Sequence, residues 1–173
     1  MFHRILVGVD DSPAGRRALE RAIELAGEGH GRLGLLGSAP EPPYWISASP
    51  VVPPHSRAQL RKDIEGWAQG CVEAATLIVP TEIPVTKLVA HGNPAAALLR
   101  EAKTGRWDLV VVGQTPRRFR LPLRRPVGER LQDCAAPVLV VHGDPPAGTR
   151  ERRATRRRSR RRRRTVPAAA KTT

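Results

Sequence analysis

The residues best suited to ligand binding in this chain follow two buried strands. Asp10 comes directly after the apolar run Ile5–Val9. Gly113 comes directly after Leu109–Val112. Glycine lets backbone N–H groups approach a ligand closely, and such groups bind phosphate oxygens at helix N-termini. The loop after Gly113 adds five guanidinium groups, which pair well with phosphate, on Arg117, Arg118, Arg120, Arg124 and Arg125.

Other kinds of chemical site find no support in the sequence. His91 ends a predicted strand without an HxxxH pattern or a His/Cys cluster, so we assign it no metal. Cys71 and Cys134 match no CxxC spacing, and we expect buried, inert thiols on helices. No serine lies in a G-x-S-x-G elbow, and no cysteine has an evident histidine partner. We therefore assign no catalytic residue and expect no enzyme, although weak ATP hydrolysis stays open.

Strands and helices alternate along the chain. Apolar runs predict strands over residues 5–9, 33–36, 85–89, 109–112 and 138–141. Ser12-Pro13 and Asn93-Pro94 are typical helix starts, with a capping side chain before a proline that needs no N–H donor. A short helix is expected around Val127, Leu131 and Cys134. The pattern predicts an α/β, Rossmann-like fold in which helices cover both faces of a five-stranded parallel sheet, with ligands beyond the strands' carboxyl ends.

Two features lie between the second and third predicted strands. The first is a proline-rich loop from residue 40, in which Tyr44 and Trp45 fit either a lid or a variable insertion. The second is a helix from Ser56 whose apolar side chains share one stripe, a spacing that predicts core packing. The stripe consists of Leu60, Ile64, Trp67, Ala68, Cys71 and Ala75.

The charge divides the chain into two parts. The formal net charge is +14, of which residues 145–173 carry +11 from eleven arginines, Lys171 and the single Glu151. Residues 1–144 therefore form the expected folded domain, and residues 145–173 form an arginine-rich tail that we expect to be disordered. The eleven arginines lie within Arg150–Arg164 and could contact nucleic acid or another polyanion in a salt-dependent way. A solvated charge run without a selected role is the alternative.

Four stretches of residues 1–144 resemble the universal stress protein family. They are Ile5–Ser12, His91–Pro94, Trp107–Gly113 and Pro137–Val141, and their order and spacing are more specific than any one of them. The resemblance implies strand order 3-2-1-4-5, as in adenine nucleotide alpha-hydrolase-like folds. It also implies a homodimer through Val138–Val141.

Nucleotide-binding members of that family carry G-x2-G-x9-G-[S/T] after the fourth strand. This sequence keeps Gly113, but Pro116 takes the second glycine position and Arg125-Pro126 the last pair, in a loop one residue shorter. Proline has no N–H to donate, so the phosphate cradle is expected to be broken. The residues that the resemblance places at a nucleotide are Val9, Asp10, Ser38, Gly113, Gln114, Arg125 and Val127. ATP is the one candidate cofactor, and no metal is expected.

These patterns lead to one expectation and three alternatives. We expect a stress-response binding or regulatory module in which ATP binding is weak or absent. One alternative is an ATP-binding protein that holds phosphates through its loop arginines, another is a nucleic-acid-associated dimer acting through its tail, and a more distant one is an adenylating or ATP-hydrolysing enzyme. No apolar run is long enough to cross a bilayer and no leader precedes the first strand, so we expect a cytoplasmic protein without membrane partners.

Overall fold

The computed structural model describes residues 1–42, 46, 50–114 and 127–143, all of which lie in the unit Met1–Gly143. Five parallel strands form one sheet in the order β3-β2-β1-β4-β5. The strands are β1 (Arg4–Val9), β2 (Arg32–Ala39), β3 (Val85–His91), β4 (Leu109–Gln114) and β5 (Val138–His142). This confirms the predicted α/β class and the strand order that the resemblance implied.

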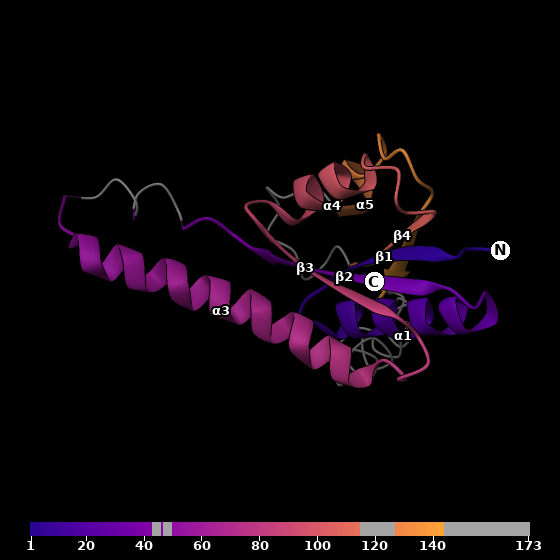
Figure 1. The fold of residues 1–173 in the computed structure, drawn as a ribbon. Coiled ribbons are helices and arrows are strands. Elements are labelled where there is room, and N and C mark those ends of the chain that lie inside the picture. The colour runs from indigo at the N-terminus through magenta and orange to yellow at the C-terminus, as the bar shows by residue number, and fades with distance from the viewer. Residues whose placement is uncertain (43–45, 47–49, 115–126, 144–173) are drawn as a thin grey trace, which may run out of the picture. The chain divides into compact units, whose positions relative to one another are not determined.

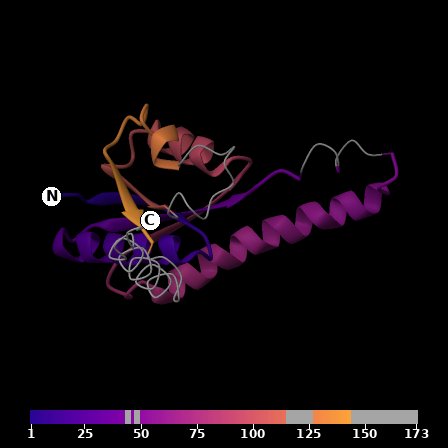
Figure 2. The same ribbon diagram turned by 180° about the vertical axis from the view of Figure 1, so that it is seen from behind.

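Helices cover both faces of the sheet (Figures 1 and 2). The helices α1 (Pro13–Glu28) and α3 (Pro54–Ile78) pack on one face, over a core that includes Ile5, Val7, Leu33 and Val111. The helices α4 (Pro94–Ala102) and α5 (Val127–Arg130) pack on the other face, over a second core. Its largest buried side chains include Leu6, Val110 and Leu131.

The two predicted helix starts form as their residue types require. The Ser12 hydroxyl accepts a hydrogen bond from the Gly15 N–H at 3.0 Å, and Pro13 opens α1. The Asn93 side chain accepts from the N–H groups of Ala95 and Ala96, at 3.0 and 3.3 Å. Both caps satisfy N–H donors that have no partner inside the helix. They also place both helix N-termini at the carboxyl edge of the sheet.

Several boundaries differ from the expectations. The second strand is longer than residues 33–36, because β2 pairs with β3 as far as Ala39 opposite His91. The last helix is shorter, since α5 ends at Arg130 and Cys134 follows in a turn region. Both Cys71 and Cys134 are partly exposed rather than buried. Tyr44, Trp45 and the loop arginines lie outside the described residues.

The stripe on α3 was expected to pack in the core, and only part of it does. Ala68 and Ala75 are buried, together with Val72, whereas Trp67 is 45% exposed. The helix residues before Ala68 lie in a part of α3 that runs past the sheet in both views (Figures 1 and 2). A helical period therefore identified the helix correctly, but half of its apolar face has no sheet beneath it.

No described helix is long and apolar enough to cross a membrane.

Candidate binding site at the carboxyl end of β1

The carboxyl edge of the sheet brings together most of the predicted site residues. Val9 ends β1, Asp10 follows it, and Gln114 ends the neighbouring strand β4 just after Gly113. Ser38 lies one residue past Gly37, the last residue of β2 that pairs with β1. Val127 is the first residue of α5. Arg125 lies outside the described residues, as do Pro116 and Pro126.

The carboxylate of Asp10 holds the turn that starts α1. Its Oδ1 accepts hydrogen bonds from the backbone N–H of Ser12 at 3.0 Å and from the Ser12 hydroxyl at 2.6 Å. Gly15 leaves room for this carboxylate, since a Cβ there would lie 2.0 Å from the same oxygen. One oxygen of Asp10 is thus committed to the turn, and its Oδ2 accepts no hydrogen bond from the described residues.

Ser38 also has a structural partner. It is 8% exposed, and its hydroxyl donates to the carbonyl of Gly92 at 2.8 Å. The N–H of Gly92 in turn donates to the carbonyl of Ala39 at 2.8 Å. Gly92 has a φ of 92°, a conformation that glycine adopts without a steric penalty. Ser38 therefore fastens the end of β2 to the turn between β3 and α4.

Gly113 is required by packing. A Cβ at this position would lie 2.4 Å from the backbone of Ala14, in the first turn of α1. Gly143, just after β5, is similarly close, because its Cβ would lie 2.9 Å from that of Ala14. The strands β4 and β5 can approach the start of α1 only without side chains at these two positions. A glycine at 113 is accordingly explained without any phosphate.

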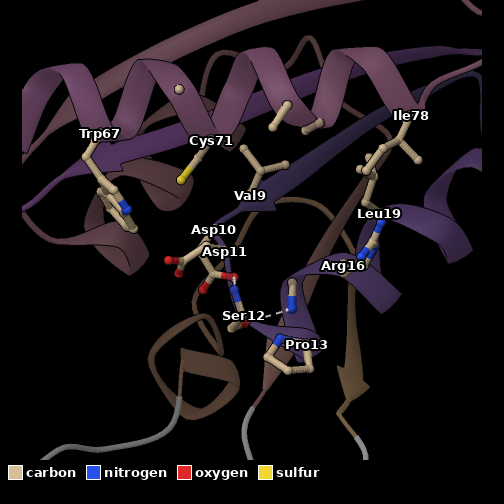
Figure 3. Close-up of a pocket in the computed structure, with 14 residues that line it drawn as sticks. Val9, Asp10, Asp11, Ser12, Pro13, Arg16, Leu19, Trp67, Cys71 and Ile78 are labelled. Carbon is tan, nitrogen blue, oxygen red and sulfur yellow. Dashed lines mark hydrogen bonds between the residues drawn. The ribbon is translucent and has the colours of Figure 1, made fainter.

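The described residues line an open cavity of about 600 Å³ between α1 and α3, next to Asp10. Val9 at the end of β1 lines the cavity, together with Pro13 and Leu19 from α1 and residues between Trp67 and Ile78 from α3. Figure 3 shows Trp67 and Cys71 on α3, across from Asp10 and Asp11. The wall is mainly apolar, and its polar end is formed by the loop that starts α1.

The negative charges at that polar end affect the pKa of the Cys71 thiol. Its pKa is raised above the ordinary value, first because partial burial disfavours the thiolate and then because the negative charges of Asp11 and Asp10 do so too. A hydrogen bond with the backbone of Asp11 opposes the rise. Cys71 is thus a protonated wall residue rather than an activated nucleophile. The sequence analysis predicted that Trp67 and Cys71 pack in the core and did not predict that they line a cavity. The spacing of four residues between them was the one sequence signal that they share a helix face.

A second cavity, of about 590 Å³, lies beyond the carboxyl ends of β2 and β3. His91 contributes to it, and its Nε2 lies 3.8 Å from a carboxylate oxygen of Glu65 on α3. Neither group belongs to a cluster of three metal-ligating side chains, and no such cluster occurs among the described residues. This cavity offers a charged rim but no centre for metal chemistry.

Comparison with known proteins identifies the family. The family model described as the universal stress protein family matches residues 1–142. The chain belongs to the universal stress protein family. A curated relative, the universal stress protein YxiE of Bacillus subtilis, is 28% identical over 117 residues, which are 65% of this chain and 79% of the relative.

Solved structures share the fold at low sequence identity. A universal stress family protein from Burkholderia pseudomallei superposes with a TM-score of 0.62 at 22% identity, covering 80% of this chain and 94% of that one. A universal stress family protein from Arabidopsis thaliana, solved with AMP bound, gives a TM-score of 0.58 at 17% identity, covering 82% and 92%. At these identities the likeness concerns the fold.

Proposed function

We propose that this universal stress protein is a binding or regulatory module in the stress response that binds ATP weakly or not at all. It acts by changing state or partner when a ligand binds, without turnover. The observation that carries the proposal is that Gly113 is explained by its close approach to Ala14. A glycine that the fold itself requires is no sign of a retained phosphate site.

The other surviving residues support the same reading. Asp10 holds the turn before α1, and Ser38 bonds to Gly92. Pro116 and Pro126 stand where nucleotide-binding relatives have a glycine and a hydroxyl residue, and neither proline can donate a backbone N–H to a phosphate. The relative from Arabidopsis was solved with AMP bound, so a nucleotide can occupy a fold of this type. In this chain the groups that would hold a phosphate are the ones replaced.

The loop arginines offer a second way to hold phosphates. Five guanidinium groups between residues 117 and 125 could replace backbone donors by side-chain ion pairs. This candidate function would restore ATP binding without the glycine motif. It predicts that binding depends on the arginine side chains, which separates it from the first proposal.

The test compares the full chain with a variant in which the motif is rebuilt. Pro116→Gly, Arg125→Gly and Pro126→Ser, with one residue inserted between positions 116 and 125, return two glycines, a hydroxyl and the nine-residue spacing to the loop. With millimolar Mg-ATP we expect no thermal shift for the wild type and a rise of a few degrees for the rebuilt variant, because a ligand bound only by the folded state stabilises it. Nucleotide content after gentle purification provides an independent readout.

A wild-type protein that purifies with ATP, or that shifts as far as the rebuilt variant, would overturn the proposal. A further variant then identifies the alternative. Changing all five loop arginines to glutamine should abolish the wild-type shift if guanidinium groups hold the phosphates; these are Arg117, Arg118, Arg120, Arg124 and Arg125. If that shift survives, the ATP is held by neither the arginines nor the lost cradle.

A further inference from the structure

The cavity between α1 and α3 has the size and lining of a small-molecule site. Its volume of about 600 Å³ lies within the range of roughly 300–1,000 Å³ that such sites occupy. Apolar side chains from both helices line it, including Leu19 from α1 and Ile78 from α3. The missing glycines and hydroxyl of the nucleotide motif belong to the loop after β4 and contribute nothing to this lining.

Small residues keep the cavity open. Gly70 lines it from α3, and a Cβ added there would meet no atom within 4 Å. Ala74, one turn further along, is also exposed and lines the same space. The apolar side chains on either side remain uncovered, with Trp67 45% and Ile78 41% exposed. An apolar body lying beside Gly70 would cover apolar surface that the protein itself leaves in water.

The polar end of the cavity is negative. Asp10 and Asp11 are both exposed there, and within the described ranges neither forms an ion pair with Lys or Arg. Arg16 also lines the cavity, but Figure 3 shows its side chain beside Leu19, away from both carboxylates. The charges of Asp10 and Asp11 reach across to Cys71, whose pKa they help to raise. The negative potential therefore extends into the cavity as far as α3.

We propose that this cavity binds a small cationic amphiphile. Its apolar or aromatic body lies beside Gly70 against Trp67, and its protonated amine pairs with Asp10 and Asp11. Trp67 can contact the body with its ring face, and an amine meets the negative end without competing with the turn bonds of Asp10 Oδ1. The inference rests on the proposed function in one respect, that the chain acts by binding.

Dansylcadaverine is a suitable probe, since it joins a naphthalene ring to a terminal ammonium group and brightens in an apolar site. Titration of the full chain is expected to give saturable binding. Gly70→Leu should weaken it by at least about tenfold, because the new side chain fills the space beside Trp67. Gly66→Leu is the matched control, since it lies on the same helix, also meets no atom within 4 Å and does not line the cavity. We expect that control to bind within about twofold of the wild type.

The charge requirement is tested by competition. Octylammonium is expected to displace the probe, whereas octanoate, with the same apolar length and a negative charge, is not. Asp10→Asn combined with Asp11→Asn should weaken octylammonium by about tenfold, because two attractive charges are removed while the Asn side chain keeps an acceptor for Ser12. Circular dichroism and thermal melting of each variant establish that it folds.

The proposal is overturned if the probe does not bind, if Gly70→Leu binds as well as Gly66→Leu, or if octanoate competes as well as octylammonium. It is also overturned if Mg-ATP displaces the probe, because the cavity would then be the nucleotide site. The last outcome contradicts weak ATP binding as well. The first three leave the ATP result unchanged, so failure of the ligand class and failure of the proposed function can be told apart.

Discussion

At the scale of single residues, Asp108 makes the densest set of bonds among the described carboxylates. Its Oδ1 accepts from the Arg4 guanidinium at 2.6 and 3.1 Å, and its Oδ2 accepts from the backbone N–H groups of Arg4 and His3 at 3.0 and 3.3 Å. The N–H of Asp108 donates to the carbonyl of Arg4 at 2.7 Å. These bonds tie the start of β1 to the start of β4, strands that the chain separates widely.

Asp108 should make stability depend on pH in acid. Its pKa lies below the ordinary 3.8, first because of the hydrogen bond from Arg4, and bonds from backbone N–H groups add to the effect. A lowered folded pKa means that the carboxylate stabilises the fold above about pH 4 and that this contribution is lost as the pH falls through the folded pKa. Asp108→Asn should be less stable than wild type at pH 7 and should lose less stability between pH 4 and pH 2. Urea unfolding at both ends of that range checks this, and equal losses in the two proteins would contradict it.

Sequence alone could find several site residues but not what they touch. Asp10 and Gly113 were recognised from their places after apolar runs, and both do lie at the carboxyl edge of the sheet. The contact of Gly113 with Ala14, and the bond from Ser38 to Gly92, join parts of the chain that no local pattern relates. Whether a glycine serves a ligand or a helix approach depends on those tertiary neighbours.

At the scale of elements, the alternating pattern predicted every strand, and boundaries were set by pairing. Residues 37–39 extend β2 because β3 offers partners up to His91, which no property of Ser38 or Ala39 could reveal. For α3, the sequence pattern predicted the helix but not how much of its apolar stripe is buried. Its period identified the helix, but Trp67 is 45% exposed although the next residue, Ala68, is buried.

The packing of β2 against Trp107 gives a prediction at this scale. A Cβ on Gly34 would lie 2.2 Å from the Trp107 ring, which is 8% exposed and whose indole N–H donates to Glu101 at 3.0 Å. Gly34→Ala should therefore destabilise the protein by about 1–3 kcal/mol, the usual cost of overpacking a core. Chemical denaturation measures the loss.

Gly27→Ala is the matched control for that prediction. Gly27 lies within α1, where an added Cβ meets nothing within 4 Å. Alanine is favoured over glycine inside helices by up to about 1 kcal/mol, so this variant should be as stable as the wild type or more so. If both substitutions had the same effect, the close approach of Gly34 to Trp107 would be wrong.

At the scale of the whole molecule, charge and fold belong to different segments. The family match covers residues 1–142, and most of the net charge of +14 lies after that point. Residues 145–173 lie outside the described structure, and their function stays a prediction from composition. β5 lies at one edge of the sheet, where Val138–Val141 could pair with a second copy, as we predict.

The arginine-rich segment should bind polyanions in a salt-dependent way. In a mobility-shift assay with duplex DNA, the full chain should bind at low salt and lose affinity steeply as salt rises, because each neutralised phosphate releases a counterion. A protein ending at residue 144 should not bind under the same conditions. Equal binding by the two proteins would place the contact in residues 1–144, and no binding by either would leave the charge run without this role.

Native mass spectrometry of the intact chain is the sharpest test of whether ATP binding is weak or absent, because one spectrum reports the tail, the assembly and any bound nucleotide. After gentle purification, and again after addition of Mg-ATP, we expect a dimer of full-length chains without a nucleotide adduct. The rebuilt loop variant, which also carries the inserted residue, should carry nucleotide in the same experiment. A wild-type spectrum dominated by one ATP per chain would contradict the claim that the phosphate cradle is lost.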